Sequence, residues 1–256
     1  MMNFTLSNQV QIPAVGIGTF MMTPDQADQA HLVVDALACG YRMIDTAQAY
    51  MNERAVGRGI KRSGVAREDI FISTKIWASQ YLTEGTVEKS LELLGTDYID
   101  LMFIHQPAGD FMAGYRKLET VAIRPMVNQI EMHPYFAQES ALKVMEEYQI
   151  VPEAWAPLGG GRHNPFDNEM VKEIAAAHGK TVGQVVLRWN VQRGVVVIPK
   201  SVHKARIEEN FQIWDFTLTE EEMQKISSLD LGYQGTAVKH FDPEFVKMCN
   251  IRKIHE

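Results

Sequence analysis

The sequence of 256 residues contains only two cysteines, Cys39 and Cys249, and these form no closely spaced motif. A scaffold stabilised by disulfides is therefore excluded, and a reducing compartment is expected. The sequence also lacks any run approaching about eighteen consecutive apolar residues. Its first residues lack a basic segment followed by an apolar one. These absences predict a cytoplasmic protein without a membrane partner.

An excess of positive charge is absent as well. The formal net charge is -7 at pH 7, so no general attraction to the phosphate backbone of nucleic acids is expected. Hydrophobic residues make up 46% of the chain and charged residues 22%, as in ordinary globular domains. No charge run, low-complexity tract or flexible linker divides the sequence. We therefore predict one domain over residues 1–256 and no nucleic-acid partner.

Short apolar runs alternate with helical patterns along the chain after a small hairpin expected over residues 4–12. Continuous apolar runs are typical of strands covered on both faces, as in a parallel sheet inside a layer of helices. The strands are expected over residues 14–18, 41–45, 70–75, 98–104, 126–131, 151–156 and 195–198. The helices are expected over residues 24–39, 53–62, 83–94, 111–121, 138–147, 168–178, 204–211 and 219–229. This alternation predicts an α/β fold, either a (β/α)₈ barrel or a doubly wound sheet.

Four ionisable residues lie at or just after the ends of neighbouring predicted strands. Asp45 ends one strand and Tyr50 lies in the loop that follows, whereas Lys75 and His105 end the next two strands. Active sites of α/β barrels are built at the carboxyl ends of the strands, so these side chains are expected to meet. For any one of them a purely structural role would be the simpler interpretation. Three successive strand ends carrying such groups indicate a catalytic site.

The chemistry of this set suits the reduction of a carbonyl group. A phenol is a weak acid at its ordinary pKa of about 10, but a neighbouring ammonium group stabilises its anion. We therefore expect Tyr50 to protonate the carbonyl oxygen, with Lys75 supplying the positive charge. Asp45 would hold Lys75 by an ion pair, and His105 would donate a hydrogen bond to the carbonyl oxygen.

A hydride donor must also bind, and the sequence offers one good phosphate site. The segment from Gly16 to Met21 lacks the third glycine of a dinucleotide-binding fingerprint. The later segment 198–210 is more informative, because a strand ends there and a helix follows Ser201. Lys200 and Arg206 bring positive charge to the amino end of that helix, where phosphate is favoured.

Five motifs, in order over nearly the whole chain, resemble the aldo-keto reductases. They are DTAQAY at 45–50, TKIW at 74–77, DLMFIH at 100–105, VNQIE at 127–131 and IPKS at 198–201. WAPLG at 155–159 and Gln106 are most similar to the bacterial 2,5-diketo-D-gluconate and glyoxal reductases. The resemblance implies a (β/α)₈ TIM barrel and an NADPH-dependent oxidoreductase that reduces small aldehydes, dicarbonyls or keto sugars. It also implies a monomer, with Tyr50, Lys75, His105 and Asp45 as the catalytic residues.

The resemblance assigns further residues to the cofactor and the substrate. Gln129 would hydrogen-bond the nicotinamide carboxamide, and Trp155 would stack on the ring. Phe20 and Trp77 would form an apolar wall of the substrate pocket. The remaining residues implied to bind NADPH border the ring, follow Trp155, or contact the adenosine 2′-phosphate and the adenine: Gly18, Thr19, Pro157, Leu158, Lys200, Ser201, Arg206 and Asn210.

One expected unit is missing from the sequence. Members of the family carry a further strand unit between the strand before His105 and the strand containing Asn128, and the seven predicted strands fall one short of eight. The gap predicts an internal deletion around residues 119–121 that removes the fifth barrel strand. The flanking strands could pair directly, their edges could pair with another chain, the protein could be unstable, or the sequence could lack residues of the native molecule.

Two alternatives to the reductase follow from the same residues. Without the missing unit, the chain could be a nicotinamide-binding protein with impaired or no catalysis. A barrel metallohydrolase would use His105, Glu131 and His133 as ligands. The sequence has neither an HExxH motif nor a His-x-His in the first strand, so no metal is expected.

Overall fold

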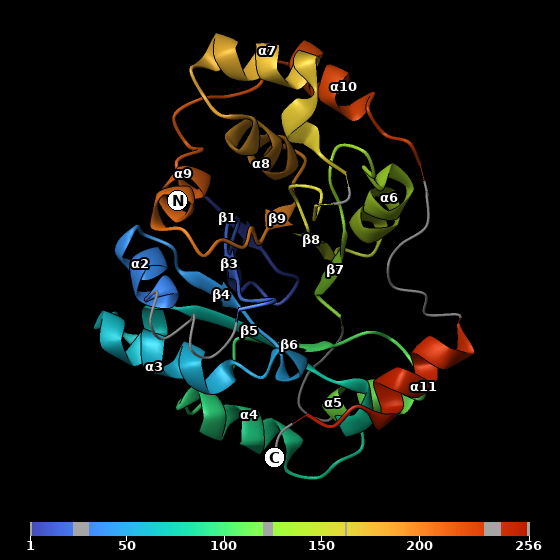
Figure 1. The fold of residues 1–256 in the computed structure, drawn as a ribbon. Coiled ribbons are helices and arrows are strands. Elements are labelled where there is room, and N and C mark those ends of the chain that lie inside the picture. The colour runs from blue at the N-terminus through green and yellow to red at the C-terminus, as the bar shows by residue number, and fades with distance from the viewer. Residues whose placement is uncertain (1, 23–30, 120–124, 162, 233–241, 255–256) are drawn as a thin grey trace. The chain divides into compact units, whose positions relative to one another are not determined.

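The computed structural model describes residues 2–22, 31–119, 125–161, 163–232 and 242–254 (Figure 1). The described residues group into two compact units that alternate along the sequence. The first unit draws on residues 1–17, 39–41 and 125–234, and the second on residues 18–38, 42–124 and 235–256. The single domain over 1–256 stays a prediction.

The chain begins with the predicted hairpin. Strands β1 (Asn3–Thr5) and β2 (Gln11–Pro13) pair in antiparallel fashion, with Phe4 opposite Ile12. Gln9 in the turn adopts a left-handed conformation with a φ of 72°. Ile12 is fully buried, so the hairpin contributes to the core of the first unit.

A parallel sheet forms the centre of the first unit. Its strands are β7 (Val127–Glu131), β8 (Val151–Trp155) and β9 (Val196–Val197), in that order across the sheet. In addition, Val15 makes a parallel bridge to Val197. The register of β7 and β8 places Glu131 beside Trp155 at the carboxyl ends of the two strands.

Helices pack around this sheet. They are α6 (Glu139–Glu147), η4 (Pro165–Asp167), α7 (Glu169–His178), α8 (Val182–Gln192), α9 (Lys204–Phe211) and α10 (Glu220–Ser227). Helix α8 is not among the predicted helices, although Thr181 and Gln184 form a capping box at its start. Its residue Trp189 is fully buried in a core shared with α7 and α10. The capping box is therefore the sequence signal that would have located this helix.

The second unit contains a four-stranded sheet in the order β3-β4-β5-β6. The strands are β3 (Ile17–Gly18), β4 (Met43–Asp45), β5 (Phe71–Ile76) and β6 (Leu101–Ile104). β4, β5 and β6 run parallel, with Asp45 opposite Ser73 and Lys75 opposite Phe103. The carboxyl ends of these strands therefore carry Asp45 and Lys75, and His105 follows β6 directly.

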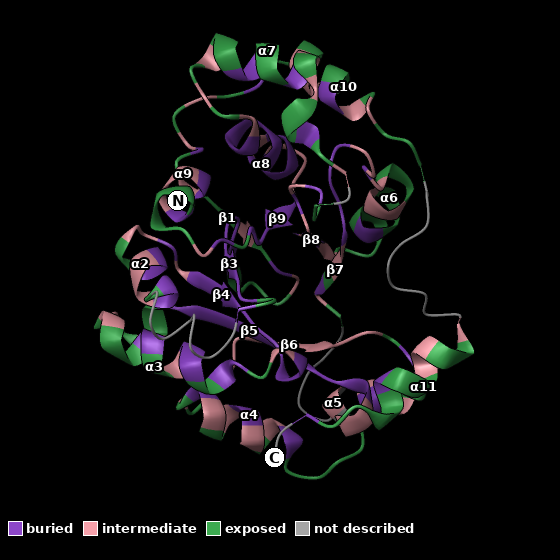
Figure 2. Ribbon diagram, viewed as in Figure 1, coloured by how far each residue is buried: buried purple, intermediate pink, exposed green. Residues whose placement is uncertain are grey.

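Helices also cover this second sheet. They are α2 (Leu32–Ala38), η1 (Gln48–Tyr50), α3 (Glu53–Ser63), η2 (Arg67–Asp69), η3 (Ala78–Gln80), α4 (Thr86–Leu94), α5 (Phe111–Glu119) and α11 (Pro243–Ile251). α3 packs between α2 and α4, and a Cβ on Gly57 would lie 2.2 Å from the carbonyl oxygen of Leu94. Figure 2 shows β4 and β5 buried, whereas α3 and α4 expose one side.

Several predicted boundaries are wrong by a few residues. The strand expected over 98–104 begins at Leu101, because the Asp100 carboxylate accepts hydrogen bonds from the backbone N–H of Ile72 and from Arg67. The strand expected over 41–45 begins at Met43. The Tyr41 hydroxyl instead donates a hydrogen bond to the carbonyl oxygen of Ile207 in the first unit. The first part of the helix expected over 24–39 lies outside the described residues, and α11 was not predicted.

The α/β class and the seven predicted strands are confirmed. Strands β3 to β9 match the seven predicted positions, and the sheets are parallel as in TIM-barrel proteins. Between β6 and β7, the described residues contain α5 and no strand, while residues 120–124 lie outside the description. The absence of a fifth barrel strand therefore stays a prediction. No helix in the described part of the chain is both long enough and apolar enough to cross a bilayer.

Candidate active site

A buried ion pair lies at the carboxyl end of the second unit's sheet. The Lys75 ammonium donates to both carboxylate oxygens of Asp45, at 2.7 and 2.6 Å, and to the carbonyl oxygen of Thr46 at 2.7 Å. The two side chains are only 3% and 2% exposed. The hydroxyl of Ser73 donates to the same carboxylate at 2.9 Å. This pair holds both groups in one geometry, because a buried charge without its partner is costly.

Tyr50 lies directly above this pair, at the end of the short helix η1. The Lys75 Nζ is 5.0 Å from the centroid of the Tyr50 ring. The centroid of the Phe20 ring lies 5.1 Å from that of Tyr50, and Phe20 itself is 58% exposed. The phenol ring is thus in contact with both a buried cation and an exposed aromatic side chain.

The His105 ring completes the group. Its centroid lies 5.6 Å from that of Tyr50 and 5.0 Å from that of Trp77, both in edge-on arrangements. Loss of hydration lowers the pKa of His105 well below 6.5, and the positive charges of Lys75 and Arg252 lower it further. The imidazole is therefore neutral near pH 7. Among the described residues, its Nδ1 has no hydrogen-bond partner.

The structure thus brings together the four predicted catalytic residues and both predicted pocket residues. Phe20, Tyr50, His105 and Trp77 form a continuous series of ring contacts. Lys75 and Asp45 lie beneath the phenol ring. Trp77 is 4% exposed and packs in a core cluster with η3 and α11.

Backbone strain marks the same positions. Phe20, Tyr50 and His105 are each followed by a non-glycine residue in the left-handed region, with φ values of 58° for Met21, 54° for Met51 and 55° for Gln106. Such conformations cost free energy and cluster at functional sites. Three left-handed residues thus directly follow side chains of the candidate site.

A buried polar network, which the sequence analysis did not predict, fixes the short helix that carries Tyr50. The Gln48 amide donates to the hydroxyls of Thr86 and Ser90, at 3.0 and 3.1 Å, and accepts the backbone N–H of Trp77 at 3.0 Å. Gln48 lies two residues before Tyr50 and is fully buried. It therefore fixes the distance between the helix that carries Tyr50 and the loop that carries Trp77.

Asn52 and Glu53 extend this network. The Asn52 amide donates to the carbonyl oxygens of Thr19 and Met22 at 2.9 Å each, and accepts the hydroxyl of Thr46 at 2.8 Å. Glu53 accepts a hydrogen bond from the hydroxyl of Thr74 at 2.7 Å, and burial raises its pKa. The sequence analysis did not single out either residue, because their partners lie on other strands and loops.

Thr19 and Gly18, predicted to border the nicotinamide ring, also belong to the second unit. Both are buried, and the Thr19 hydroxyl donates to the carbonyl oxygen of Asp45 at 3.0 Å. The backbone N–H of Thr19 donates to the same oxygen at 2.9 Å. These two residues therefore lie beside the strand end that carries Asp45.

The other residues predicted to bind the cofactor lie in the first unit. Gln129 and Trp155 lie on neighbouring strands, and the Gln129 amide donates to Glu153 at 2.5 Å. After Trp155 the chain turns sharply, with Ala156 left-handed and the N–H of Gly159 bonded to the carbonyl oxygen of Ala156. Pro157 is buried within this turn, and Leu158 packs against the core of the first unit.

The predicted phosphate site lies at the start of α9. Lys200 and Arg206 are exposed, and Ser201 exchanges hydrogen bonds with the backbone of His203 just before the helix. The first turn of α9 contains no acidic residue. Asn210 is buried further along the same helix. Two exposed cations at a helix amino end fit the phosphate group of a nucleotide.

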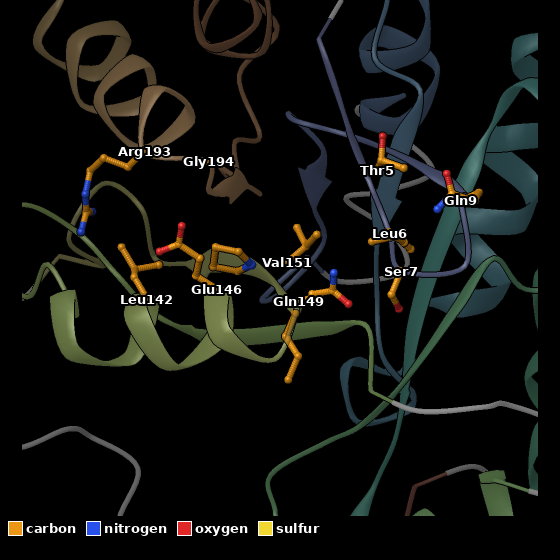
Figure 3. A pocket seen from close by; sticks show the side chains of 12 residues that line it. Thr5, Leu6, Ser7, Gln9, Leu142, Glu146, Gln149, Val151, Arg193 and Gly194 are labelled. Atoms are coloured by element: carbon orange, nitrogen blue, oxygen red, sulfur yellow. The ribbon is translucent and has the colours of Figure 1, made fainter.

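A separate cavity of about 550 Å³ lies elsewhere in the first unit, between the hairpin turn and the start of β8 (Figure 3). Thr5, Leu6, Ser7 and Gln9 line one side, and Glu146, Gln149 and Arg193 line the other. It borders Val151, the first residue of β8, and so lies at the amino end of that strand. Barrel active sites lie at the opposite ends of the strands, so we assign this cavity no catalytic role.

The described part of the chain offers little for a metal ion. Within the described residues, no group of three or more His, Cys, Asp and Glu side chains is arranged to hold a metal ion. Glu131 and His133 approach to 3.6 Å in the first unit, whereas His105 belongs to the second. The metallohydrolase alternative gains no support from these positions.

Comparisons with known proteins point to one family. The model of the aldo/keto reductase family matches residues 14–122 and 112–231. The chain is 42% identical to the 9,11-endoperoxide prostaglandin H2 reductase of Trypanosoma cruzi, over 88% of this chain and 90% of that protein. It is 41% identical to the glyoxal reductase of Bacillus subtilis, over 88% and 91%. It also resembles the crystal structure of MGS-M4, an aldo-keto reductase from a deep-sea metagenome, with a TM-score of 0.86, 37% identity and coverage of 91% and 97%.

Proposed function

Because the chain belongs to the aldo/keto reductase family, we propose that it reduces small aldehydes, dicarbonyls or keto sugars to alcohols with NADPH. The observation that carries the proposal is the contact of Tyr50 with Lys75 and His105 above the buried Asp45. Relatives named as reductases of glyoxal and of a prostaglandin endoperoxide differ widely in substrate. The site supports reduction of a carbonyl group, and the substrate class is proposed from the family resemblance.

The residues of this chain supply the proton and the polar environment for the reaction. Bound NADPH supplies the hydride to the carbonyl carbon. The Tyr50 hydroxyl donates a proton to the carbonyl oxygen, and the charge of Lys75 stabilises the phenolate that remains. Asp45 holds the ammonium in place at 2.6 Å. The neutral His105 imidazole donates a hydrogen bond from Nε2 to the same carbonyl oxygen.

The contacts to the cofactor are proposed from the resemblance, residue by residue. Gln129 would bind the carboxamide and Trp155 would stack on the nicotinamide ring, with Gly18 and Thr19 at its border. The preference for NADPH over NADH rests on Lys200 and Arg206, whose exposed charges suit a 2′-phosphate. Ser201, Asn210, Pro157 and Leu158 would contact the rest of the dinucleotide.

We also propose that the unit containing the fifth barrel strand is missing around residues 119–121. The two matches to the family model overlap at residues 112–122. The alignment with the T. cruzi protein runs over 257 positions but includes only 88% of the 256 residues of this chain. That relative thus has residues without a counterpart here, which supports a deletion. The cofactor-binding protein without catalysis is not favoured, because the relatives are named as reductases.

Oxidation of NADPH, followed by its absorbance, tests the proposed function. Purified protein is mixed with methylglyoxal, benzaldehyde or a keto sugar, and turnover is expected with at least one of them. Tyr50→Phe should lower kcat by about 10²-fold or more, because the general acid is lost while the cofactor contacts remain. Tyr148→Phe removes the hydroxyl of an exposed tyrosine and serves as the matched control. Equal turnover by Tyr50→Phe and the wild type would refute the assignment.

A cytoplasmic location and a monomeric state remain proposals drawn from the sequence. A missing strand unit would leave a sheet edge open, and association through that edge is the alternative to the monomer. Sedimentation of the purified protein distinguishes the two states.

A further inference from the structure

The segment that follows α11 brings one arginine to the candidate active site. Cys249 and Ile254 are buried in the core cluster that contains Trp77, Ala78 and Tyr81. Between these two anchors, the carbonyl oxygen of Arg252 accepts a hydrogen bond from the hydroxyl of Ser79 at 2.9 Å. The backbone of Arg252 is therefore held against η3, although the residue lies near the end of the sequence.

The guanidinium of Arg252 reaches two of the residues that frame the site. Its Nη2 donates to the carbonyl oxygen of Ala49, the residue before Tyr50, at 3.0 Å. Its Cζ lies 5.4 Å from the centroid of the Trp77 ring, whose centroid in turn lies 5.0 Å from that of His105. The charge of Arg252 is one of the causes that lower the pKa of His105, after burial and Lys75. The arginine therefore acts electrostatically on the site.

Within the described ranges, no carboxylate forms an ion pair with Arg252. Among the described residues, Arg67 and Arg193 also stack on aromatic rings, at 3.9 and 4.1 Å from the centroids. Each of these also forms an ion pair at 2.7 Å, with Asp100 and Glu139 respectively. Arg252 has no Asp or Glu partner within the described part of the chain, and the residue is exposed. The other cation of the site, Lys75, is neutralised by Asp45.

We propose that Arg252 determines specificity by binding an anionic group of the substrate, so that the enzyme prefers carbonyl compounds that carry a carboxylate. This inference rests on the proposed reductase function. A guanidinium offers several N–H donors in one plane, and the bond to Ala49 uses only one of its nitrogens. The planar fork matches the two oxygens of a carboxylate. Trp77 beneath it would support the apolar part of the same substrate.

The test compares two aldehydes that differ by one carboxylate. The value of kcat/KM is measured with NADPH for 4-carboxybenzaldehyde and for benzaldehyde, and their ratio is compared between variants. Taking the ratio within one variant cancels any change that affects both aldehydes equally. Comparing the ratios of two variants cancels the intrinsic difference in reactivity between the two aldehydes. Arg252→Gln should lower the ratio about tenfold through loss of the charged hydrogen bonds. Arg252→Lys keeps the charge without the fork and should give an intermediate ratio.

Lys253→Gln is the matched control, because it removes the same charge from the next, exposed residue. It should leave the ratio unchanged. Added salt should lower the ratio of the wild type and leave that of Arg252→Gln nearly constant. The affinity for NADPH, measured by quenching of protein fluorescence, should be the same in both variants.

The possible failures are distinguishable. Turnover of both aldehydes with equal ratios in the wild type and Arg252→Gln overturns the inference and leaves the proposed function standing. An equal loss in Lys253→Gln, or a loss of NADPH affinity with no change in the ratio, also overturns it. Absence of turnover with either aldehyde in the wild type overturns the proposed function and the inference together.

Discussion

Replacement of Asp45 by asparagine separates the structural role of the ion pair from its chemical role. The change keeps the shape of the side chain but removes the negative charge that accepts two hydrogen bonds from Lys75, at 2.6 and 2.7 Å. Since the two side chains are 2% and 3% exposed, water cannot replace the lost partner. Removing one member of a buried pair costs about 3–5 kcal/mol, so Asp45→Asn should lower the free energy of unfolding by about that amount.

A second substitution distinguishes the charge from the packing. In Asp45→Asn combined with Lys75→Met, both charges of the buried pair are removed, and more than half of the lost free energy of unfolding should return. Turnover should nevertheless be lost in both variants. In the double variant Tyr50 has no neighbouring cation, and in the single variant the Lys75 ammonium is no longer held in position by a carboxylate.

Urea unfolding followed by circular dichroism gives the free energies, and NADPH oxidation gives the turnover. Glu92→Gln is the control, because its ion pair with Lys89 is exposed and should matter far less. A decrease of less than about 1 kcal/mol in the free energy of unfolding of Asp45→Asn would refute the reasoning, since an unpaired buried charge destabilises a protein by more than that. A double variant less stable than the single one would refute it as well.

Three further predictions concern the site and its supports. Loss of hydration holds the pKa of His105 well below 6.5. Below about pH 6.5 the unfolded chain therefore binds a proton that the folded chain does not. The free energy of unfolding should decrease as the pH is lowered, by up to about 1.4 kcal/mol per pH unit. Urea titrations from pH 7 to 5 should show a shallower fall for His105→Gln, and equal slopes would contradict the prediction. Gly159→Ala should destabilise the protein far more than Gly64→Ala in thermal unfolding. Both glycines have positive φ, but a Cβ on Gly159 would lie 1.7 Å from a carbonyl oxygen, whereas nothing lies within 4 Å at Gly64. Gln48→Leu should cost about 1–3 kcal/mol of unfolding free energy and lower kcat, because it leaves the buried N–H of Trp77 without an acceptor; unchanged stability in urea would show that another group accepts this N–H.

The catalytic group could be predicted from the sequence because its geometry follows from one general rule. Parallel strands that are neighbours in a sheet end at the same edge, so Asp45, Lys75 and His105 had to meet once their strands were identified. Tyr50 is close in sequence to Asp45, and its position depends on a short local helix. Neither inference required the exact boundaries of any element. The wrong starts predicted for two strands, at residues 41 and 98, therefore did not affect the predicted site.

The supporting residues depend on tertiary contacts that no local pattern encodes. Gln48 binds partners 29 to 42 residues away, and Arg252 binds Ala49 across 203 residues. Arg252 reaches the site only because α11 packs against η3, and α11 itself was not predicted. α8 was missed for a different reason, since its capping box is readable in the sequence but was not used.

Transfer of deuterium from the cofactor to the product tests the central claim most directly. The protein is incubated with benzaldehyde and NADPH in which deuterium replaces both hydrogens at C4 of the nicotinamide ring, and the benzyl alcohol is analysed by mass spectrometry. The account predicts one deuterium on the former carbonyl carbon with the wild type, and no alcohol above the background without enzyme with Tyr50→Phe. Alcohol without deuterium, or labelled alcohol formed equally fast by Tyr50→Phe, would contradict it.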